Sequence, residues 1–281
     1  FLGERMAEVA ERMGATVVRL TAEPRKPVDR QAIADALAEH KPKVLALLHG
    51  DGSTGIQQPL EGLADLAHEH GALLLVDSRW TISAVELNVD ALNIDICIAG
   101  SQKAISAYPG LGLITFSPRA VDKYEQRKSP VLSWTLDLAN LQQFRTDARA
   151  AQTMPAPIVY ALTELLQLIY EQGNSYRIER MINRRDAVVA GLETLGLTIF
   201  ADPAHRLSTV TVVNVPDGVD QDRVRSKLLS PFRIDIGGGL GALQNKAWRV
   251  GIMGHSAQPT FLLSFITLLE TILVEEGHSI P

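Results

Sequence analysis

The chain has 281 residues, of which 46% are hydrophobic and 21% charged, which is typical of a globular protein that buries a sizeable core. The formal net charge of −5 argues against partners that require a basic surface, such as nucleic acid or an anionic membrane. Cys97 is the single cysteine, which excludes an internal disulfide framework and fits a reducing compartment such as the cytoplasm.

The ends and the apolar runs give no sign of a membrane anchor. Runs such as residues 72–76 are far too short to cross a bilayer, and no signal-peptide pattern stands at the start. The sequence opens with Phe1 rather than Met and enters a helical pattern at once. We therefore expect a cut, a processed end or the visible part of a longer chain, with any organelle-targeting segment upstream of Phe1.

Helical and strand patterns alternate through the first part of the chain. Apolar spacing predicts a helix over residues 4–13, which Gly14 would end, and another over residues 29–40, which Asp29 would cap. A further helix is expected over residues 60–70. Short apolar or β-branched runs predict strands over residues 16–20, 43–48, 72–77, 94–99 and 111–116.

Strands of almost continuous apolar character between helices predict an α/β fold, with a mainly parallel sheet sandwiched by helices. After residue 155 the pattern changes to that of an α+β unit. Helices are expected there over residues 158–170, 174–195, 220–229 and 258–275, and strands over residues 208–215, near Ile234 and over residues 248–252. We expect a large domain over residues 1–172 and a smaller C-terminal domain over residues 173–281.

Polar residues follow the predicted strands of the first domain, where parallel sheets gather their ligands. They lie in residues 49–54, at Asp77 and in residues 100–103. Lys103 could form a Schiff base if burial or neighbours lower its pKa, and a solvated surface lysine is the alternative. Asp77 ends an apolar strand and needs a partner if it is buried, unless it caps a turn or a helix.

These segments together resemble the class V aminotransferases, which are pyridoxal-phosphate (PLP) enzymes of fold-type I, and within them the alanine/serine–glyoxylate group. Asp77 and the Ser101-Gln102-Lys103 segment that ends 26 positions later carry the resemblance. Further similar segments are residues 1–29, 49–60, 99–110 and 248–257. The resemblance covers essentially the whole chain in the family's order. It implies the fold-type I large domain, with its N-terminal part missing, and a small C-terminal domain.

The resemblance implies a role for each matched residue. Lys103 would bind the PLP aldehyde and then move the proton between substrate carbon and cofactor. Asp77 would hold the pyridinium nitrogen protonated. Gln102 would contact the cofactor phosphate, and Ser53 is expected near the cofactor. Thr153 matches a threonine that reaches the phosphate of the neighbouring subunit, which implies a homodimer with a shared active site.

Arg249 lies on an apolar predicted strand, between Trp248 and Val250. An arginine offers a planar fork that suits a carboxylate. In the family, the matching residue binds the α-carboxylate of the amino acid and of the keto acid. The alternative is an internal ion pair with an aspartate or glutamate.

Several positions depart from the family. Gly52 stands where a hydroxyl residue commonly contacts the cofactor's phenolic oxygen, Arg79 where a small apolar residue packs under the ring, and Ala150 where a tyrosine reaches the partner's phosphate. The phosphate loop at a helix N-terminus and the aromatic residue that stacks on the ring would lie upstream of Phe1.

The remaining polar features receive structural interpretations. The glycines of residues 237–241 do not join a strand to a helix, so we expect a turn near the substrate entrance rather than a phosphate loop. Residues 177–185 are expected to form a solvated helix face, and Cys97 to lie in the core. No metal is expected, because no ligand spacing links the histidines that we place on the surface, namely His68, His70, His205 and His278.

The leading hypothesis is transamination between a small amino acid, alanine or serine, and a small keto acid such as glyoxylate or pyruvate. The alternatives are (S)-ureidoglycine–glyoxylate transamination and a catalytically silent member of the family that acts as a structural or binding subunit. Cysteine desulfurase chemistry is disfavoured, because Gln102 stands where that chemistry has a histidine and Cys97 lies within a predicted strand.

Overall fold

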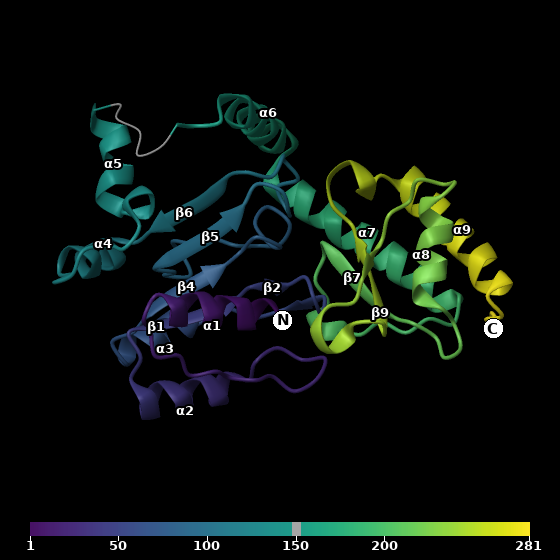
Figure 1. The fold of residues 1–281 in the computed structure, drawn as a ribbon, viewed down its shortest axis with the longest axis horizontal. Coiled ribbons are helices and arrows are strands. Elements are labelled where there is room, and N and C mark those ends of the chain that lie inside the picture. Colours follow the sequence, from purple (N-terminus) through teal and green to yellow (C-terminus); the bar gives the residue numbers. More distant parts are fainter. Residues whose placement is uncertain (148–152) are drawn as a thin grey trace.

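The computed structural model describes residues 1–147 and 153–281. Figure 1 shows a larger sheet and its helices at one end of the molecule and a smaller sheet, covered by helices, at the other end. Helix α7 (Asn174–Thr194) runs between them. Helix α7 follows α6 (Ala156–Gln172) after the single residue Gly173, whose φ is 82°. The domain boundary that the sequence predicts at residue 172 stays a prediction.

The larger sheet holds four of the five strands expected in the first part of the chain. In the described part of the chain its order is β1 (Val44–Leu48), β4 (Leu73–Asp77), β5 (Ile96–Gly100) and β6 (Gly112–Phe116). Strands β1, β4 and β5 run parallel, whereas β6 pairs antiparallel with β5. The predicted α/β fold with a mainly parallel sheet is therefore confirmed.

Helices and a short hairpin surround this sheet. The helices are α1 (Leu2–Arg12), α2 (Arg30–His40), α3 (Leu63–Glu69), α4 (Pro118–Glu125), α5 (Leu138–Asp147) and α6. Asp29 caps α2 as predicted, because its side chain accepts from the backbone N–H groups of Gln31 and Ala32. After β1, strands β2 (Gly50–Asp51) and β3 (Ile56–Gln57) form an antiparallel hairpin.

Helices also pack on the smaller sheet, which is antiparallel and has the described order β7-β9-β8. The elements after α7 are β7 (Val210–Asn214), α8 (Gln221–Leu229), β8 (Gly237–Gly238), β9 (Ala247–Gly251) and α9 (Pro259–Glu275). Short 3-10 turns in the chain lie at Trp134–Leu136, Pro203–His205, Gly241–Leu243 and Gly254–Ala257. Trp248 is fully buried in the core between this sheet and the helices.

Buried hydrogen bonds join the two sides close to the expected active site. The hydroxyl of Thr209 donates to the carbonyl oxygen of Trp80 at 2.8 Å. Arg177, on α7, donates to the carbonyl oxygens of Ser83 and Ala104, each at 2.9 Å. Arg177 is only 5% exposed, so the expectation of a solvated face over residues 177–185 is wrong at this position.

Three further expectations differ from the structure. Residues 16–20 form no strand, and the strand expected near Ile234 lies at Gly237–Gly238. His68 is not a free surface residue, because its Nε2 lies 2.7 Å from a carboxylate oxygen of buried Asp95. Cys97 is buried, as expected. Among the helices that the structure describes, none is both long and apolar enough to cross a membrane.

Candidate active site

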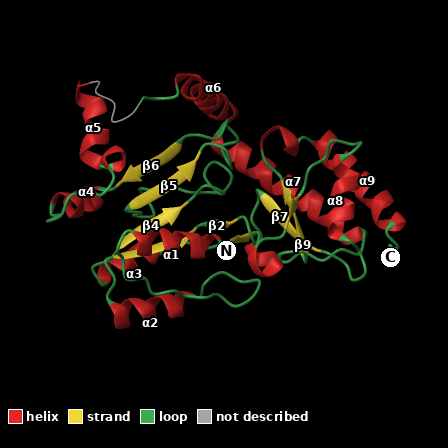
Figure 2. Ribbon diagram, viewed as in Figure 1, coloured by secondary structure: helices red, strands yellow, loops and turns green. Residues whose placement is uncertain are grey.

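The residues predicted to carry chemistry gather at the carboxyl edge of the larger sheet. Asp77 is the last residue of β4, opposite Leu48 of β1 and Ile98 of β5. Lys103 follows β5 in a turn, and the β2–β3 hairpin follows β1. Figure 2 shows this edge of the larger sheet facing the smaller sheet and its helices. The parallel arrangement of three strands thus brings these segments together.

Asp77 is buried, with 1% exposure, and its carboxylate already has a partner within the chain. Arg79 donates to it through its backbone N–H at 3.0 Å, through Nε at 2.7 Å and through Nη2. The hydrogen bond to Asp77 raises the pKa of the Arg79 guanidinium. The requirement that a buried carboxylate be paired is therefore met by the residue that departs from the family.

Lys103 is half-buried and forms no ion pair or hydrogen bond through Nζ among the described residues. Its nitrogen lies 4.7 Å from the centroid of the Trp80 ring, within cation–π distance. Burial lowers the pKa of Lys103, and the positive charges of Arg249 and Arg79 lower it further. These surroundings favour the neutral amine, which is the nucleophilic form.

Arg249 projects from β9 and contacts main-chain carbonyls. Its Nε donates to Gly238 at 2.8 Å, and its Nη1 to Gly52 at 3.4 Å. In the part of the chain that the structure describes, no acidic side chain forms an ion pair with Arg249, so the alternative of an internal ion pair is not observed there. Burial and the neighbouring charge of Arg225 lower the pKa of Arg249. A carboxylate ligand would relieve this unpaired charge.

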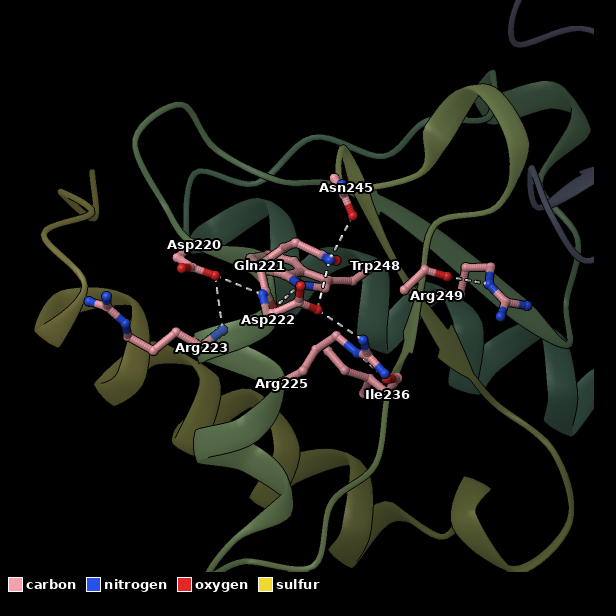
Figure 3. A network of polar contacts seen from close by, with 10 residues as sticks. Asp220, Gln221, Asp222, Arg223, Arg225, Ile236, Asn245, Trp248 and Arg249 are labelled. Atoms are coloured by element: carbon pink, nitrogen blue, oxygen red, sulfur yellow. Dashed lines mark hydrogen bonds and ion pairs between the residues drawn. The ribbon is translucent and has the colours of Figure 1, made fainter.

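Figure 3 shows a network of polar side chains next to β8, the strand whose Gly238 carbonyl oxygen accepts a hydrogen bond from Arg249. Arg225 donates through Nε to the carbonyl oxygen of Ile236 at 2.9 Å and through Nη1 to Asp222 at 3.2 Å. The same Asp222 oxygen accepts from Gln221 at 2.8 Å. Because these contacts fix the residue before Gly237, they also position the carbonyl group of Gly238 under Arg249.

Asp51 organises the hairpin loop, a role that sequence reasoning did not assign although it singled out residues 49–54. Its carboxylate accepts from the Ser53 N–H at 2.8 Å, from the Ser53 hydroxyl at 2.6 Å and from the Thr54 hydroxyl at 3.1 Å. The negative charge of Asp51 also acts to raise the pKa of both Arg79 and Arg249. A small acidic residue followed by Gly-Ser-Thr is a turn signal that could have identified it.

The other matched residues lie outside this group of contacts. Gln102 is exposed, and no hydrogen bond of its side chain is present among the described residues. Thr153 is exposed in the segment before α6. Ala150 lies outside the described residues. Trp80, whose indole packs on Gly52 and under the Lys103 amine, is a further residue that sequence reasoning missed.

The fold, with a lysine and a buried aspartate at the sheet edge, is that of the fold-type I aminotransferases. A solved alanine–glyoxylate aminotransferase from Nostoc sp. is similar with a TM-score of 0.94 and 36% sequence identity, and the match covers 97% of this chain and 73% of that one. Ureidoglycine–glyoxylate aminotransferase from Bacillus subtilis is similar with a TM-score of 0.96 and 34% identity, over 100% of this chain and 73% of that one.

The chain belongs to the aminotransferase class-V family, whose profile matches residues 4–247. The alanine–glyoxylate aminotransferase of Rattus norvegicus is 39% identical over 262 residues. That match covers 91% of this chain and 63% of the relative, so the chain spans less than two thirds of that relative's length.

The family depends on PLP, and the chemistry of the donor set fits this cofactor. A half-buried amine without an acidic partner suits the aldehyde, and a buried carboxylate suits a protonated ring nitrogen. A buried indole N–H without a hydrogen-bond partner, that of Trp80, offers a donor to an oxygen of the ligand. Arg79 is the one residue of this group that would have to share Asp77 with the cofactor.

Proposed function

We propose that this protein is a PLP-dependent aminotransferase that moves an amino group between a small amino acid, alanine or serine, and a small keto acid such as glyoxylate or pyruvate. The observation that carries the proposal is the environment of Lys103. Its amine is half-buried, has no anionic partner among the described residues and lies near two arginines that favour its neutral form.

When bound, PLP supplies an electron sink for the substrate carbon that loses its proton. Lys103 would bind the cofactor and then move that proton, and its burial beside two arginines lowers its pKa and so favours the neutral amine that accepts a proton. Asp77 holds a proton on the ring nitrogen from its buried position at the end of β4. Arg249 orients the substrate carboxylate with its planar guanidinium group.

The supporting contacts are proposed from the matched positions. Gln102 and Ser53 contact the cofactor, and Gln102 does so at the phosphate. Gln102 is exposed at the edge of the larger sheet. The Ser53 hydroxyl already donates its proton to Asp51, so it can only accept a hydrogen bond from the cofactor. Thr153, exposed before α6, reaches the phosphate of a second copy of the chain in a homodimer. Light scattering that gives the mass of one chain would contradict the homodimer.

The buried free thiol of Cys97 agrees with a reducing compartment such as the cytoplasm.

The keto acid is assigned with more support than the amino donor. Relatives named for glyoxylate include the Rattus norvegicus enzyme and the (S)-ureidoglycine–glyoxylate transaminase of Bacillus subtilis, which is 33% identical over 99% of this chain. Ureidoglycine is therefore the second candidate donor. A silent family member is the third reading, because Arg79 occupies the Asp77 carboxylate.

An amino-transfer assay on the full-length protein tests the proposal. Pairs of alanine, serine or ureidoglycine with glyoxylate or pyruvate are assayed. Lys103→Ala abolishes turnover, whereas Lys123→Ala, an exposed control on α4, leaves it unchanged. Arg249→Ala raises KM for keto acids by roughly 100-fold, because it removes a charge-assisted pair worth about 2–3 kcal/mol. No turnover with any of these pairs contradicts the proposed transamination. Unchanged keto-acid affinity in Arg249→Ala contradicts the role given to Arg249.

A further inference from the structure

The indole of Trp80 is buried at the candidate active site with an unused hydrogen-bond donor. The residue is 6% exposed, and its Nε1 has no partner. A buried N–H without an acceptor is rare in folded proteins, because it has lost its hydrogen bonds to water without replacement. The Trp80 ring lies beside Lys103, whose Nζ is 4.7 Å from the ring centroid, so a ligand bound by Lys103 would lie next to this indole.

Gly52 is the residue that makes room for this indole. A Cβ atom at Gly52 would overlap the six-membered part of the Trp80 ring and would lie 2.7 Å from Nε1. The indole therefore fills the space in which a side chain of residue 52 would lie. The carbonyl oxygen of Gly52 accepts a hydrogen bond from Arg249, the residue proposed to bind the substrate carboxylate. The indole nitrogen therefore lies close to a residue that contacts Arg249.

Two cationic groups near the indole, Lys103 and Arg249, have no acidic partner among the described residues. The Lys103 amine lies over the ring at 4.7 Å from its centroid, and Arg249 contacts Gly52. The Arg79 charge is also close enough to act on Lys103. A ligand that satisfies these groups must bring oxygen atoms with negative charge.

The chemistry of PLP identifies one such oxygen. Its phenolic oxygen is bonded to the ring carbon beside the one that bears the aldehyde, so it lies next to the Lys103 nitrogen when that nitrogen reaches the aldehyde. We propose that the Trp80 indole N–H donates a hydrogen bond to this oxygen in its ionised form, and that residue 52 is glycine because the indole requires its space. This assignment rests on the proposed function.

The departure from the family at Gly52 and the position of the Trp80 indole are linked, because the two occupy the same space. The hydroxyl residue expected at position 52 is absent, and a donor from position 80 takes over the same oxygen. The exchange requires both changes together, because a side chain at position 52 and the indole overlap. A double-variant experiment can therefore separate this role from a role of Trp80 in packing alone.

The first experiment measures the visible absorbance of the PLP-loaded protein against pH. That absorbance reports the proton shared between the Lys103 nitrogen and the phenolic oxygen. A donor that stabilises the ionised oxygen makes the proton easier to lose, so Trp80→Phe raises the midpoint by roughly one pH unit and weakens PLP binding by roughly tenfold. Trp134→Phe, at an exposed tryptophan, is the matched control and changes neither.

The second experiment moves the donor back to position 52. Gly52→Ser alone lowers thermal stability, because the serine overlaps the indole. The double variant Gly52→Ser/Trp80→Ala relieves the overlap and supplies a hydroxyl, so it returns the midpoint toward the unaltered value. Trp80→Ala alone does not. This pair of measurements remains informative even if Trp80→Phe folds poorly.

Each outcome decides the assignment. A midpoint and a PLP affinity unchanged in Trp80→Phe would overturn it while leaving the proposed function standing. Spectra that stay unchanged while keto-acid affinity falls would assign the indole to the substrate carboxylate instead, and would also overturn it. Failure of the unaltered protein to bind PLP at all would overturn the proposed function and this inference together.

Discussion

At the scale of single residues, the chemistry depends on which charges are already paired. Asp77 has Arg79, whereas Lys103 and Arg249 have no acidic partner in the described structure. A protonated ring nitrogen must therefore compete with the Arg79 guanidinium for one carboxylate, while the amine and the second guanidinium are ready for a ligand.

Arg79→Val tests this competition. Without its partner, buried Asp77 destabilises the cofactor-free protein by about 2 kcal/mol, less than for a fully buried pair because Arg79 is partly exposed. The carboxylate is then free for the ring nitrogen, so PLP binds about tenfold more tightly. Denaturant unfolding and a PLP titration measure the two effects, with Arg12→Val on exposed α1 as control. Weaker PLP binding in Arg79→Val would show that Arg79 contacts the cofactor itself.

At the scale of elements, strand β8 determines where Arg249 can lie. Gly237 pairs with Arg249 in the sheet, and a Cβ atom at Gly237 would lie 3.0 Å from Nη2. The guanidinium therefore lies flat against a strand without side chains, and Arg225 holds that strand from behind (Figure 3).

Gly237→Ala displaces the Arg249 guanidinium by a few tenths of an ångström. We expect KM for keto acids to rise about tenfold, equivalent to about 1.4 kcal/mol, with PLP affinity and thermal stability nearly unchanged. Gly112→Ala is the matched control, because nothing lies within 4 Å of a Cβ atom built there. Steady-state kinetics and an unfolding curve check both variants. An equal loss of stability in both variants, with KM unchanged, would contradict the role given to β8.

The sequence predicted most elements, because local rules decide them. Asp29 caps α2 as expected, and the apolar runs around Leu74 and Cys97 form strands, of which β4 is mostly buried whereas Cys97 is the buried residue of β5. The strand predicted over residues 16–20 fails because β propensity requires a neighbouring strand to pair with, and none pairs there in the described chain.

The candidate site could be predicted only in part. Strand-end positions made Asp77 and Lys103 candidates, the family resemblance implied their roles, and the structure places both at one sheet edge. The contact of Arg79 with Asp77 is local, but the pattern of strand ends alone does not show that the guanidinium turns back onto the carboxylate. The packing of Trp80 on Gly52 joins residues far apart in the sequence and had no local signal.

At the scale of the whole molecule, the site lies where the two sides of the structure meet, and a buried histidine links its edge to overall stability. His49 follows β1, is 3% exposed and has an Nδ1 without a partner. Burial lowers its pKa from 6.5 to about 4. The unfolded chain therefore binds a proton below about pH 6.5, whereas the folded protein does so only below about pH 4.

Stability should thus be unaffected by His49 above pH 6.5 and fall as the pH drops from 6.5 to about 4, by about 3 kcal/mol in all. Denaturant unfolding at several pH values measures this dependence. His49→Gln removes this part of the slope, and His40→Gln, at an exposed histidine on α2, retains it. An identical slope in His49→Gln would show that other groups cause the acid sensitivity.

The central claim is that Lys103 is the residue that bonds to PLP. Borohydride reduction of the PLP-loaded protein, followed by peptide mass spectrometry, tests it most directly. The account predicts loss of the yellow colour and the added mass of reduced PLP on the peptide that contains Lys103, and no such mass in Lys103→Ala. Added mass on a different lysine, or none on any peptide of a protein saturated with PLP, would contradict it.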